Sequence, residues 1–300
     1  MSKLAMNWWK NLKGKVKRQE LLKNHTSFRI GGPATLFIEP QDIADLKLLL
    51  DLLKRYKIST LLIGAGSNIL VSDQGVKGAV LRLSAPYFKS INFKNNYCSV
   101  GAGVLLNNLV ASAQKRDLAG LEFLVGIPGT VGGALVMNAG AQGKNIQDLI
   151  QNVTVMDGRG RIKTLNKKKI KFGYRYSSLS PYIVIGARLK LTPGRRTQIR
   201  KKIKEYWDYR KLTQDCTLPS AGCVFQNPPG HCAGKLIDLC GLKGKKLGGA
   251  CISQKHANFI LNLGDAQARD VLRLMDMIRK KVKHKFSITL KPEIKIWQTR

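Results

Sequence analysis

The feature that most constrains the fold is a glycine-rich but apolar stretch at residues 126–141, G-I-P-G-T-V-G-G-A-L-V-M-N-A-G-A. Its glycines stand among apolar residues, unlike the serine-rich composition of a flexible linker. Backbone without side chains can lie flat against a large planar ligand and its pyrophosphate, with Thr130 and Asn138 as polar contacts. The alternative is that the glycines allow a helix to pack closely on a sheet. Both interpretations require a compact fold here.

A second glycine-rich turn, Gly64–Asn68, follows the apolar run at 60–63 and precedes the strand-like residues 69–72. Backbone N–H groups of such a turn can hold phosphate. It is not the dinucleotide fingerprint, because Ile69 stands where the third glycine would be and a strand follows, and no Gly-Lys-Ser/Thr makes it a P-loop. Taken alone it is equally well an ordinary hairpin turn. Two such loops in one chain favour a dinucleotide ligand.

A single thiol, Cys223, stands on a turn of small residues, with Pro219 before it and Pro228 after it. Pro fixes φ at both ends and Gly222 leaves room for a ligand, so the turn suits proton or nucleophile chemistry. The alternative is a plain loop with a buried cysteine. None of the six cysteines forms a C-x-x-C pair, so we expect no metal site and free thiols in a reducing cytoplasm.

Hydrophobic periodicity and turn residues predict a mixed chain of helices and strands. The helices are expected at 41–57, 105–116, 197–211, 235–240 and 265–284, the last capped by Asp265. Strands are expected at 24–32, 34–39, 60–63, 69–72, 79–83, 90–93, 97–101, 153–156, 161–165, 182–191, 259–262, 287–290 and 293–297.

The length of 300 residues predicts two or three domains, and 44% hydrophobic residues support real cores. Pro193-Gly194 marks a domain boundary. The first twenty residues, with Trp8, Trp9 and many lysines, predict a short docking helix rather than a segment on a membrane surface. We expect no signal peptide and no membrane span, because no apolar run is long enough.

The formal net charge is +34, from 52 basic and 18 acidic residues. Such a field attracts nucleic acid, anionic membranes or small anions. The basic residues are spread over several runs and no aromatic-interleaved patch accompanies them. We therefore interpret most of them as solvated faces and expect no nucleic-acid partner.

Eight separated blocks together resemble the UDP-N-acetylenolpyruvoylglucosamine reductase family, in its shorter form. The blocks stand in the family's order, and the resemblance covers nearly the whole chain from Asn24 to Trp297. They are the stretch at 126–141 and N-H-T-S-F-R-I-G-G-P-A, I-G-A-G-S-N-I-L, F-G-Y-R-Y-S, P-S-A-G-C-V-F-Q-N-P, G-L-K-G-K-K-L-G-G-A, K-H-A-N-F-I-L-N and K-P-E-I.

The resemblance implies an α+β protein, with a two-subdomain FAD-binding fold of the vanillyl-alcohol-oxidase type and a C-terminal α+β substrate-binding domain. Residues 1–80 would form the first FAD subdomain, joined by the C-terminal strand at 286–300. Residues 81–194 would form the second subdomain and residues 195–285 the substrate domain. We expect a monomer.

The same resemblance implies non-covalent FAD, with NADPH as hydride donor and UDP-N-acetylglucosamine enolpyruvate as substrate, reduced to UDP-N-acetylmuramate for peptidoglycan. No histidine lies in the two glycine loops to suggest a covalent flavin. The residues implied at the cofactor are Arg29, Gly31, Gly64, Ala65, Gly66, Ser67, Asn68, Gly126, Pro128, Gly129, Thr130, Gly132, Gly133, Asn138 and Ala139.

Three residues match the family's catalytic positions: Arg175, Cys223 and Glu293. The reaction places a hydride on the β-carbon of an enol ether, so charge builds on the conjugated carboxylate. A guanidinium at Arg175, paired with Glu293, suits that charge. Cys223 would then protonate the α-carbon, since a thiol pKa lies closer to neutrality than that of an alcohol. Without the resemblance, Arg175 and Glu293 would be surface charges.

Five further residues are implied at the substrate: Tyr174, Lys211, Asn227, His256 and Asn258. The last two are equally well structural. Two positions depart from the family pattern, with Lys235 in place of a bulky aromatic residue and Lys295 where arginine is common. The rival functions are another FAD oxidase of the same fold and a basic nucleic-acid-binding protein.

Overall fold

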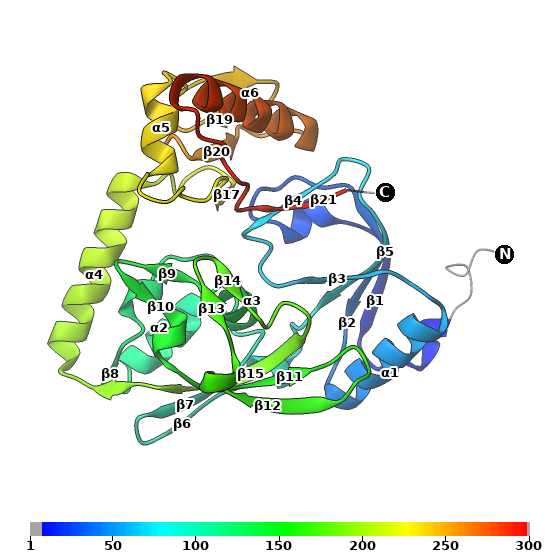
Figure 1. The fold of residues 1–300 in the computed structure, drawn as a ribbon. Coiled ribbons are helices and arrows are strands. Elements are labelled where there is room, and N and C mark those ends of the chain that lie inside the picture. The colour runs from blue at the N-terminus through cyan, green and yellow to red at the C-terminus, as the bar shows by residue number, and fades with distance from the viewer. Residues whose placement is uncertain (1–7, 299–300) are drawn as a thin grey trace. The chain divides into compact units, whose positions relative to one another are not determined.

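The computed structural model describes residues 8–298, which form two compact units (Figure 1). The first unit contains the described chain from residue 8 to Arg18, then Thr35–Ala65 and Gly78–Asp208. The second contains Gln19–Ala34, Gly66–Lys77 and the chain from Tyr209 onward. Each unit has a hydrophobic core of its own. The finer division into three domains stays a prediction.

The first unit is built on two sheets. A five-stranded antiparallel sheet has the order β12 (Ile162–Asn166), β11 (Ile150–Met156), β15 (Ile183–Lys190), β7 (Tyr97–Gly101) and β6 (Ile91–Lys94). A four-stranded sheet has the order β1 (Lys15–Leu21), β2 (Pro33–Glu39), β5 (Val76–Arg82) and β3 (Thr60–Ile63), with β3 parallel to β5. The helices α1 (Ile43–Arg55), α2 (Leu106–Gln114) and α3 (Val131–Val136) contribute to its core.

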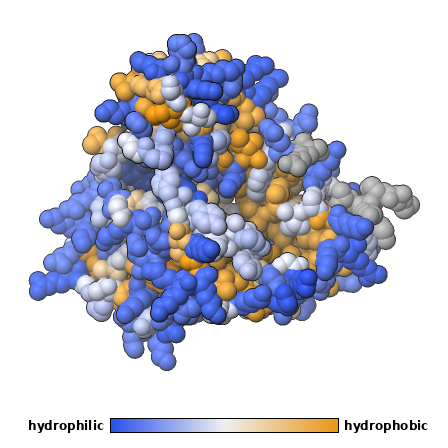
Figure 2. All heavy atoms as spheres, viewed as in Figure 1, coloured by the Kyte–Doolittle hydropathy of each residue, from blue (hydrophilic) through white to orange (hydrophobic). Residues whose placement is uncertain are grey.

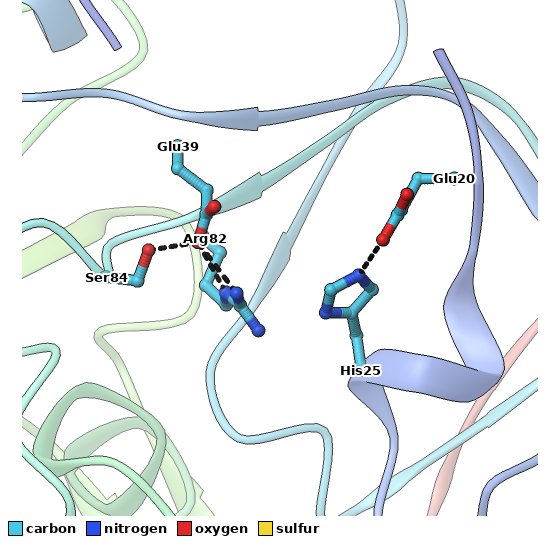
Figure 3. Close-up of polar contacts among 5 residues, drawn as sticks. All are labelled: Glu20, His25, Glu39, Arg82 and Ser84. Atoms are coloured by element: carbon cyan, nitrogen blue, oxygen red, sulfur yellow. Dashed lines mark hydrogen bonds and ion pairs between the residues drawn. The ribbon is translucent and has the colours of Figure 1, made fainter. Parts of the chain in front are cut away.

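A partly buried ion pair joins two strands of the four-stranded sheet (Figure 3). The guanidinium of Arg82 on β5 contacts Glu39 on β2 at 2.8 Å, and the Ser84 hydroxyl donates to the same carboxylate. The guanidinium also lies over the ring of Phe37, 5.1 Å from its centroid. Burial of a charge is tolerated here because the partner is a carboxylate within hydrogen-bond reach.

The second unit packs two helices against a small sheet. The sheet order is β17 (Ser220–Cys223), β20 (Phe259–Asn262), β19 (Ala250–Ile252) and β18 (Lys246–Leu247), with antiparallel pairs throughout. The helices are α5 (Ala233–Leu239) and the amphipathic α6 (Ala268–Phe286), whose buried face includes Val271, Leu274, Ile278 and Val282. The C-terminal strand β21 (Lys295–Trp297) pairs in parallel with β4 (Ile69–Val71).

The remaining regular elements are short, apart from the long helix α4 (Arg196–Thr213). The short strands are β8 (Leu118–Ala119), β9 (Gly140–Ala141), β10 (Lys144–Asn145), β13 (Phe172–Gly173), β14 (Tyr176–Ser177) and β16 (Thr192–Pro193). The 3₁₀ turns are η1 (Trp8–Asn11), η2 (Leu22–His25), η3 (Pro86–Lys89), η4 (Glu122–Leu124), η5 (Ile146–Asp148) and η6 (Lys167–Lys169).

The strand predicted at 24–32 is wrong. The turn η2 covers its start, and the positive φ of Arg29 (54°) and of Gly31 (142°) prevents an extended path. The docking helix predicted in the first twenty residues is also wrong over the described part. That part holds the short turn η1 and the strand β1, and the rest of the prediction lies outside the described residues.

Two predictions around α6 are wrong as well. The helix begins after Gln267, not Asp265, and Asp270 completes a capping box with Gln267. Asp73 also accepts from the Ala268 N–H, at 2.7 Å. No strand forms at 287–290, because Ser287 takes a left-handed conformation (φ 58°) that ends the helix. The other predicted helices and strands are present, most of them with shifted ends and those at 60–63, 97–101 and 259–262 with the predicted ends.

Hydrophilic residues cover most of the face in Figure 2. Helix α4 fully buries only Ile199 along its length, so its basic residues lie on a solvated helix, as the charge pattern predicted. Several bases are paired with acids at exposed sites, including Arg196 with Asp117 at 2.7 Å, which lowers the pKa of Asp117 mainly through that side-chain hydrogen bond. Such pairs contribute little to stability. None of the described helices is long and apolar enough to cross a membrane.

We expect Asp45→Ala to lower the free energy of unfolding by about 2 kcal/mol. The buried carboxylate of Asp45 accepts from the backbone N–H groups of Lys13, Gly14 and Gln41, each at 2.9 Å. Urea unfolding is the measurement. Asp51→Ala, on the exposed face of the same helix, is the matched control and should change stability by less than about 0.5 kcal/mol. Equal effects would show that the Asp45 contacts are not stabilising.

Candidate active site

The two glycine-rich segments of the sequence meet in the first unit. Gly64 follows β3, and Thr130 is the N-cap of α3, where its hydroxyl accepts from the Gly133 N–H at 3.3 Å. A Cβ atom on Gly64 would lie 2.5 Å from Oγ1 of Thr130. The absence of a side chain at Gly64 therefore lets the segments touch.

Hydrogen bonds hold the second glycine-rich segment in place, and part of its backbone stays accessible. Gly132 donates to the Ala102 carbonyl at 2.9 Å, and a Cβ atom there would lie 3.1 Å from the Ala102 side chain. Leu106 donates to the Gly129 carbonyl, and Gly126 donates to the Asn107 side chain. Gly133 nevertheless remains exposed, and Gly129 is partly exposed. An apolar strip of backbone that stays accessible fits a large planar ligand with a pyrophosphate, so the residues present fit the cofactor predicted for them.

The other end of the first loop belongs to the second unit, since the division falls between Ala65 and Gly66. A Cβ atom on Gly66 would lie 2.0 Å from the carbonyl oxygen of His25. The His25 ring is held by Glu20, with 2.8 Å between Nε2 and Oε1 (Figure 3). Asn68 donates its amide to the carbonyl of Glu293 at 3.3 Å. The loop is thus tied to the segment that carries a predicted catalytic residue.

Of the other predicted cofactor residues, Arg29 is exposed on the left-handed turn and Gly31 packs against Val71. Ala65 and Ser67 are partly accessible, and Pro128 is exposed. Ala139 continues the helix end through a hydrogen bond from its N–H to the Ala134 carbonyl, at 2.8 Å.

Arg175 lies at the turn of the β13–β14 hairpin, in a left-handed conformation (φ 55°). Its Nη1 donates to the Gly140 carbonyl at 3.3 Å, and its guanidinium lies over the Tyr174 ring, 5.2 Å from the centroid. Tyr174 is 55% exposed. The left-handed backbone costs energy for a residue other than glycine and is tolerated where surrounding contacts fix it.

Those contacts come from residues 136–140, at the end of the glycine-rich stretch. Ser177 donates its hydroxyl to the Val136 carbonyl at 2.9 Å. The buried Asn138 donates its amide to the Gly173 carbonyl at 3.1 Å, and its oxygen accepts from the Gln147 N–H at 3.3 Å. Asn138, predicted as a cofactor contact, therefore fastens the arginine hairpin to residues 136–140. Sequence reasoning missed this support, although Ser177 closes the F-G-Y-R-Y-S block.

Cys223 ends strand β17 in the second unit and is partly buried. Gly222 before it has φ 73°, and the strand pairing is irregular between Ser220 and Cys223. The residues after Cys223 run alongside residues 291–293, because Glu293 donates its N–H to the Val224 carbonyl at 2.8 Å and Phe225 bridges Pro292. The structure thus brings the Cys223 and Glu293 segments together. Bringing Arg175 to them stays a prediction.

The predicted substrate residues of the second unit differ in what their side chains contact. Asn227 accepts from the Ala233 N–H at the start of α5, at 2.9 Å. Asn258 contacts the backbone of Phe225 with both amide atoms. Burial lowers the pKa of His256, whose Nδ1 accepts from the Asn258 N–H at 3.2 Å. This shift favours the neutral form of the ring. Lys211 is exposed on α4.

The chain is similar to known proteins over nearly its whole length. The family model described as FAD binding domain matches residues 34–166, and that described as UDP-N-acetylenolpyruvoylglucosamine reductase, C-terminal domain, matches residues 213–297. UDP-N-acetylenolpyruvoylglucosamine reductase 2 of Symbiobacterium thermophilum is 44% identical over 95% of this chain and 92% of its own. The Bacillus subtilis reductase is 39% identical over 94% of each chain.

The chain is also similar to solved structures. The crystal structure of UDP-N-acetylenolpyruvylglucosamine reductase from Thermus caldophilus matches with a TM-score of 0.83 and 38% identity, over 95% of this chain and 100% of that one. BBE-like 1 of Physcomitrella patens matches with a TM-score of 0.50 and 14% identity, over 92% of this chain and 59% of that one. The second likeness shows the fold alone.

Gly64→Ala should weaken FAD binding by about tenfold, because the added methyl group must displace Thr130 and overpacking costs about 1–3 kcal/mol. Titration of the stripped protein with FAD, followed by flavin fluorescence, measures it. Gly158→Ala is the matched control, since nothing lies within 4 Å of a Cβ atom there and its φ is not positive. Unchanged affinity in Gly64→Ala would contradict a role for the Gly64–Thr130 contact.

Proposed function

The chain belongs to the UDP-N-acetylenolpyruvoylglucosamine reductase family and is an FAD-containing oxidoreductase, and we propose that it reduces UDP-N-acetylglucosamine enolpyruvate to UDP-N-acetylmuramate with NADPH. Its fold is the two-subdomain FAD-binding fold of the vanillyl-alcohol-oxidase type with a C-terminal α+β domain. The product is a precursor of peptidoglycan, and we place the reaction in the cytoplasm.

One structural observation supports the proposal most directly. The thiol of Cys223 stands on a strand end that is hydrogen-bonded to the Glu293 segment, while Arg175 stands on a hairpin fastened to the glycine segment. The three groups that the reaction needs are thus each on supported backbone and not on free loops. Such support is what positioned catalytic groups require.

The reaction adds a hydride and a proton across the carbon–carbon double bond of the enolpyruvyl group. FAD, which the two glycine-rich segments would hold, would supply the hydride for the β-carbon of the substrate, and NADPH, leaving as NADP⁺, would be the source of that hydride. Arg175 holds the carboxylate, where the electron pair of the double bond is delocalised after hydride addition, because a guanidinium stabilises this charge in place. Cys223 gives its Sγ proton to the α-carbon, which restores a saturated carbon. Glu293 acts together with Arg175 on this developing charge.

Two of the other predicted substrate residues would orient the substrate. Tyr174 presents an exposed ring beside Arg175, and Lys211 presents a cation suited to a diphosphate. We propose both as substrate contacts. The departures at Lys235 and Lys295 leave the catalytic groups unchanged.

The purified protein should be yellow, and NADPH should bleach the flavin absorption near the visible maximum, which the enolpyruvyl sugar nucleotide then restores without oxygen. Absorption spectra under anaerobic conditions before and after each addition measure this. A folded protein that takes up no FAD, or a reduced flavin that only oxygen reoxidises, would overturn the proposal. Oxidation of an alcohol without NADPH would indicate an oxidase of the same fold.

Cys223→Ala should keep flavin reduction by NADPH and slow reoxidation by substrate by about 10²–10⁴-fold, because only the second step needs the proton. Cys223→Ser should retain much of the rate. Stopped-flow spectroscopy of the two half-reactions separates these effects. Equal losses in both half-reactions would assign Cys223 a structural role.

A further inference from the structure

Asn258 makes three hydrogen bonds to the two residues that directly follow Cys223. Its side-chain oxygen accepts from the Phe225 N–H at 3.0 Å, and its side-chain nitrogen donates to the Phe225 carbonyl at 2.8 Å. Its backbone carbonyl accepts from the Val224 N–H at 2.9 Å. Asn258 itself is 1% exposed. Its amide is therefore turned to the backbone and away from the surface.

These hydrogen bonds of Asn258 begin where the pairing between strands β17 and β20 ends. β17 pairs with β20 at Cys223 and Phe259, but the register shifts just before, where Gly222 has a positive φ. The ladder alone therefore leaves the direction of the chain after Cys223 loosely fixed. A side-chain amide offers the same donor and acceptor as a peptide group, so Asn258 continues the pairing by one residue.

The opposite edge of the same segment pairs with the chain around Glu293. Glu293 donates its N–H to the Val224 carbonyl at 2.8 Å, and Gln226 donates to the Lys291 carbonyl at 2.9 Å. These bonds flank the bridge between Phe225 and Pro292, which leaves the N–H and carbonyl of Phe225 directed to Asn258. The segment after Cys223 is thus held on one edge by Asn258 and on the other by residues 291–293.

We propose that Asn258 is a positioning residue for Cys223 and Glu293 and makes no contact with substrate. This rests on the proposed function, in which those two residues act on the substrate. Loss of the amide leaves the Phe225 groups unpaired in a buried segment and lets the Cys223 end shift. A displacement of the proton donor by about 1 Å slows its step by up to about 10²-fold.

The test compares Asn258→Ala with Asn262→Ala in the FAD-loaded full-length protein. Asn262 is the matched control, because it is also buried (2% exposed), lies on β20, and bonds backbone groups elsewhere, at Phe28, Gly264 and Ala266. Stopped-flow measurements give flavin reduction by NADPH and reoxidation by substrate. Titration of the oxidised flavin gives the substrate Kd.

For Asn258→Ala we expect reoxidation at saturating substrate to fall by about 10- to 100-fold, with reduction by NADPH and substrate Kd each within about twofold of wild type. Asn262→Ala should leave reoxidation unchanged. A tenfold rise in Kd with the saturating rate preserved would identify a substrate contact and overturn the proposal. Equal loss of rate in both variants would also overturn it. Asn258→Asp, which keeps the side-chain volume but loses the donor, replaces the alanine variant if that fails to fold.

A second measurement does not depend on the reaction. Amide hydrogen exchange should become faster over residues 221–226 and 291–294 in Asn258→Ala and stay unchanged there in Asn262→Ala. If wild type shows no substrate-dependent reoxidation, the proposed function fails while this comparison still decides whether Asn258 holds the two segments. Unchanged exchange in Asn258→Ala would overturn the positioning role.

Discussion

The fold depends on close approach of backbone to backbone at glycines that join segments distant in sequence. A Cβ atom on Gly75 would lie 1.9 Å from the Pro33 carbonyl oxygen, and one on Gly66 would lie 2.0 Å from that of His25. Both contacts join the chain at 19–34 to the chain at 66–77, which together enter the second unit. At such distances only hydrogen fits, so alanine at either position would force the segments apart. The Gly64–Thr130 contact does the same within the first unit.

Elements with a strong local signal were predictable from the sequence. The strand at 97–101 and the apolar strand at 259–262 form with the predicted ends, and the amphipathic helix predicted at 41–57 forms at Ile43–Arg55. The failures occur where contacts distant in sequence decide. Residues 24–32 look extended, but Leu22 and Lys23 bond to Gly32 and Gly31, which closes a compact turn. No local sequence pattern predicts the hydrogen bonds that close this turn.

The types of residue at the site were predictable, but their orientation was not. Motifs identified Asn138 and Asn258 as polar residues near the chemistry. A ligand contact was expected for Asn138, whereas a substrate contact and a structural role were equally well supported for Asn258. In the structure each amide engages main-chain groups, at Gly173 and Gln147 for Asn138 and at Phe225 for Asn258. An asparagine side chain satisfies a peptide group as well as it satisfies a ligand, so its residue type alone leaves the two roles equal. Only the burial and the partner atoms separate them.

The irregular backbone at the site explains why those supports are needed. Arg175 and Asn138 both take left-handed conformations without being glycine, and Cys223 follows a glycine at φ 73°. At Arg175 and Asn138 this conformation costs about 1–3 kcal/mol each, and it persists because the surrounding contacts fix it. The buried asparagines and Ser177 supply hydrogen bonds at these places. Buried polar groups therefore fix the local backbone at the positions where a cation and a thiol must be held. The basic residues that give the chain its large positive charge lie instead on solvated helices such as α4.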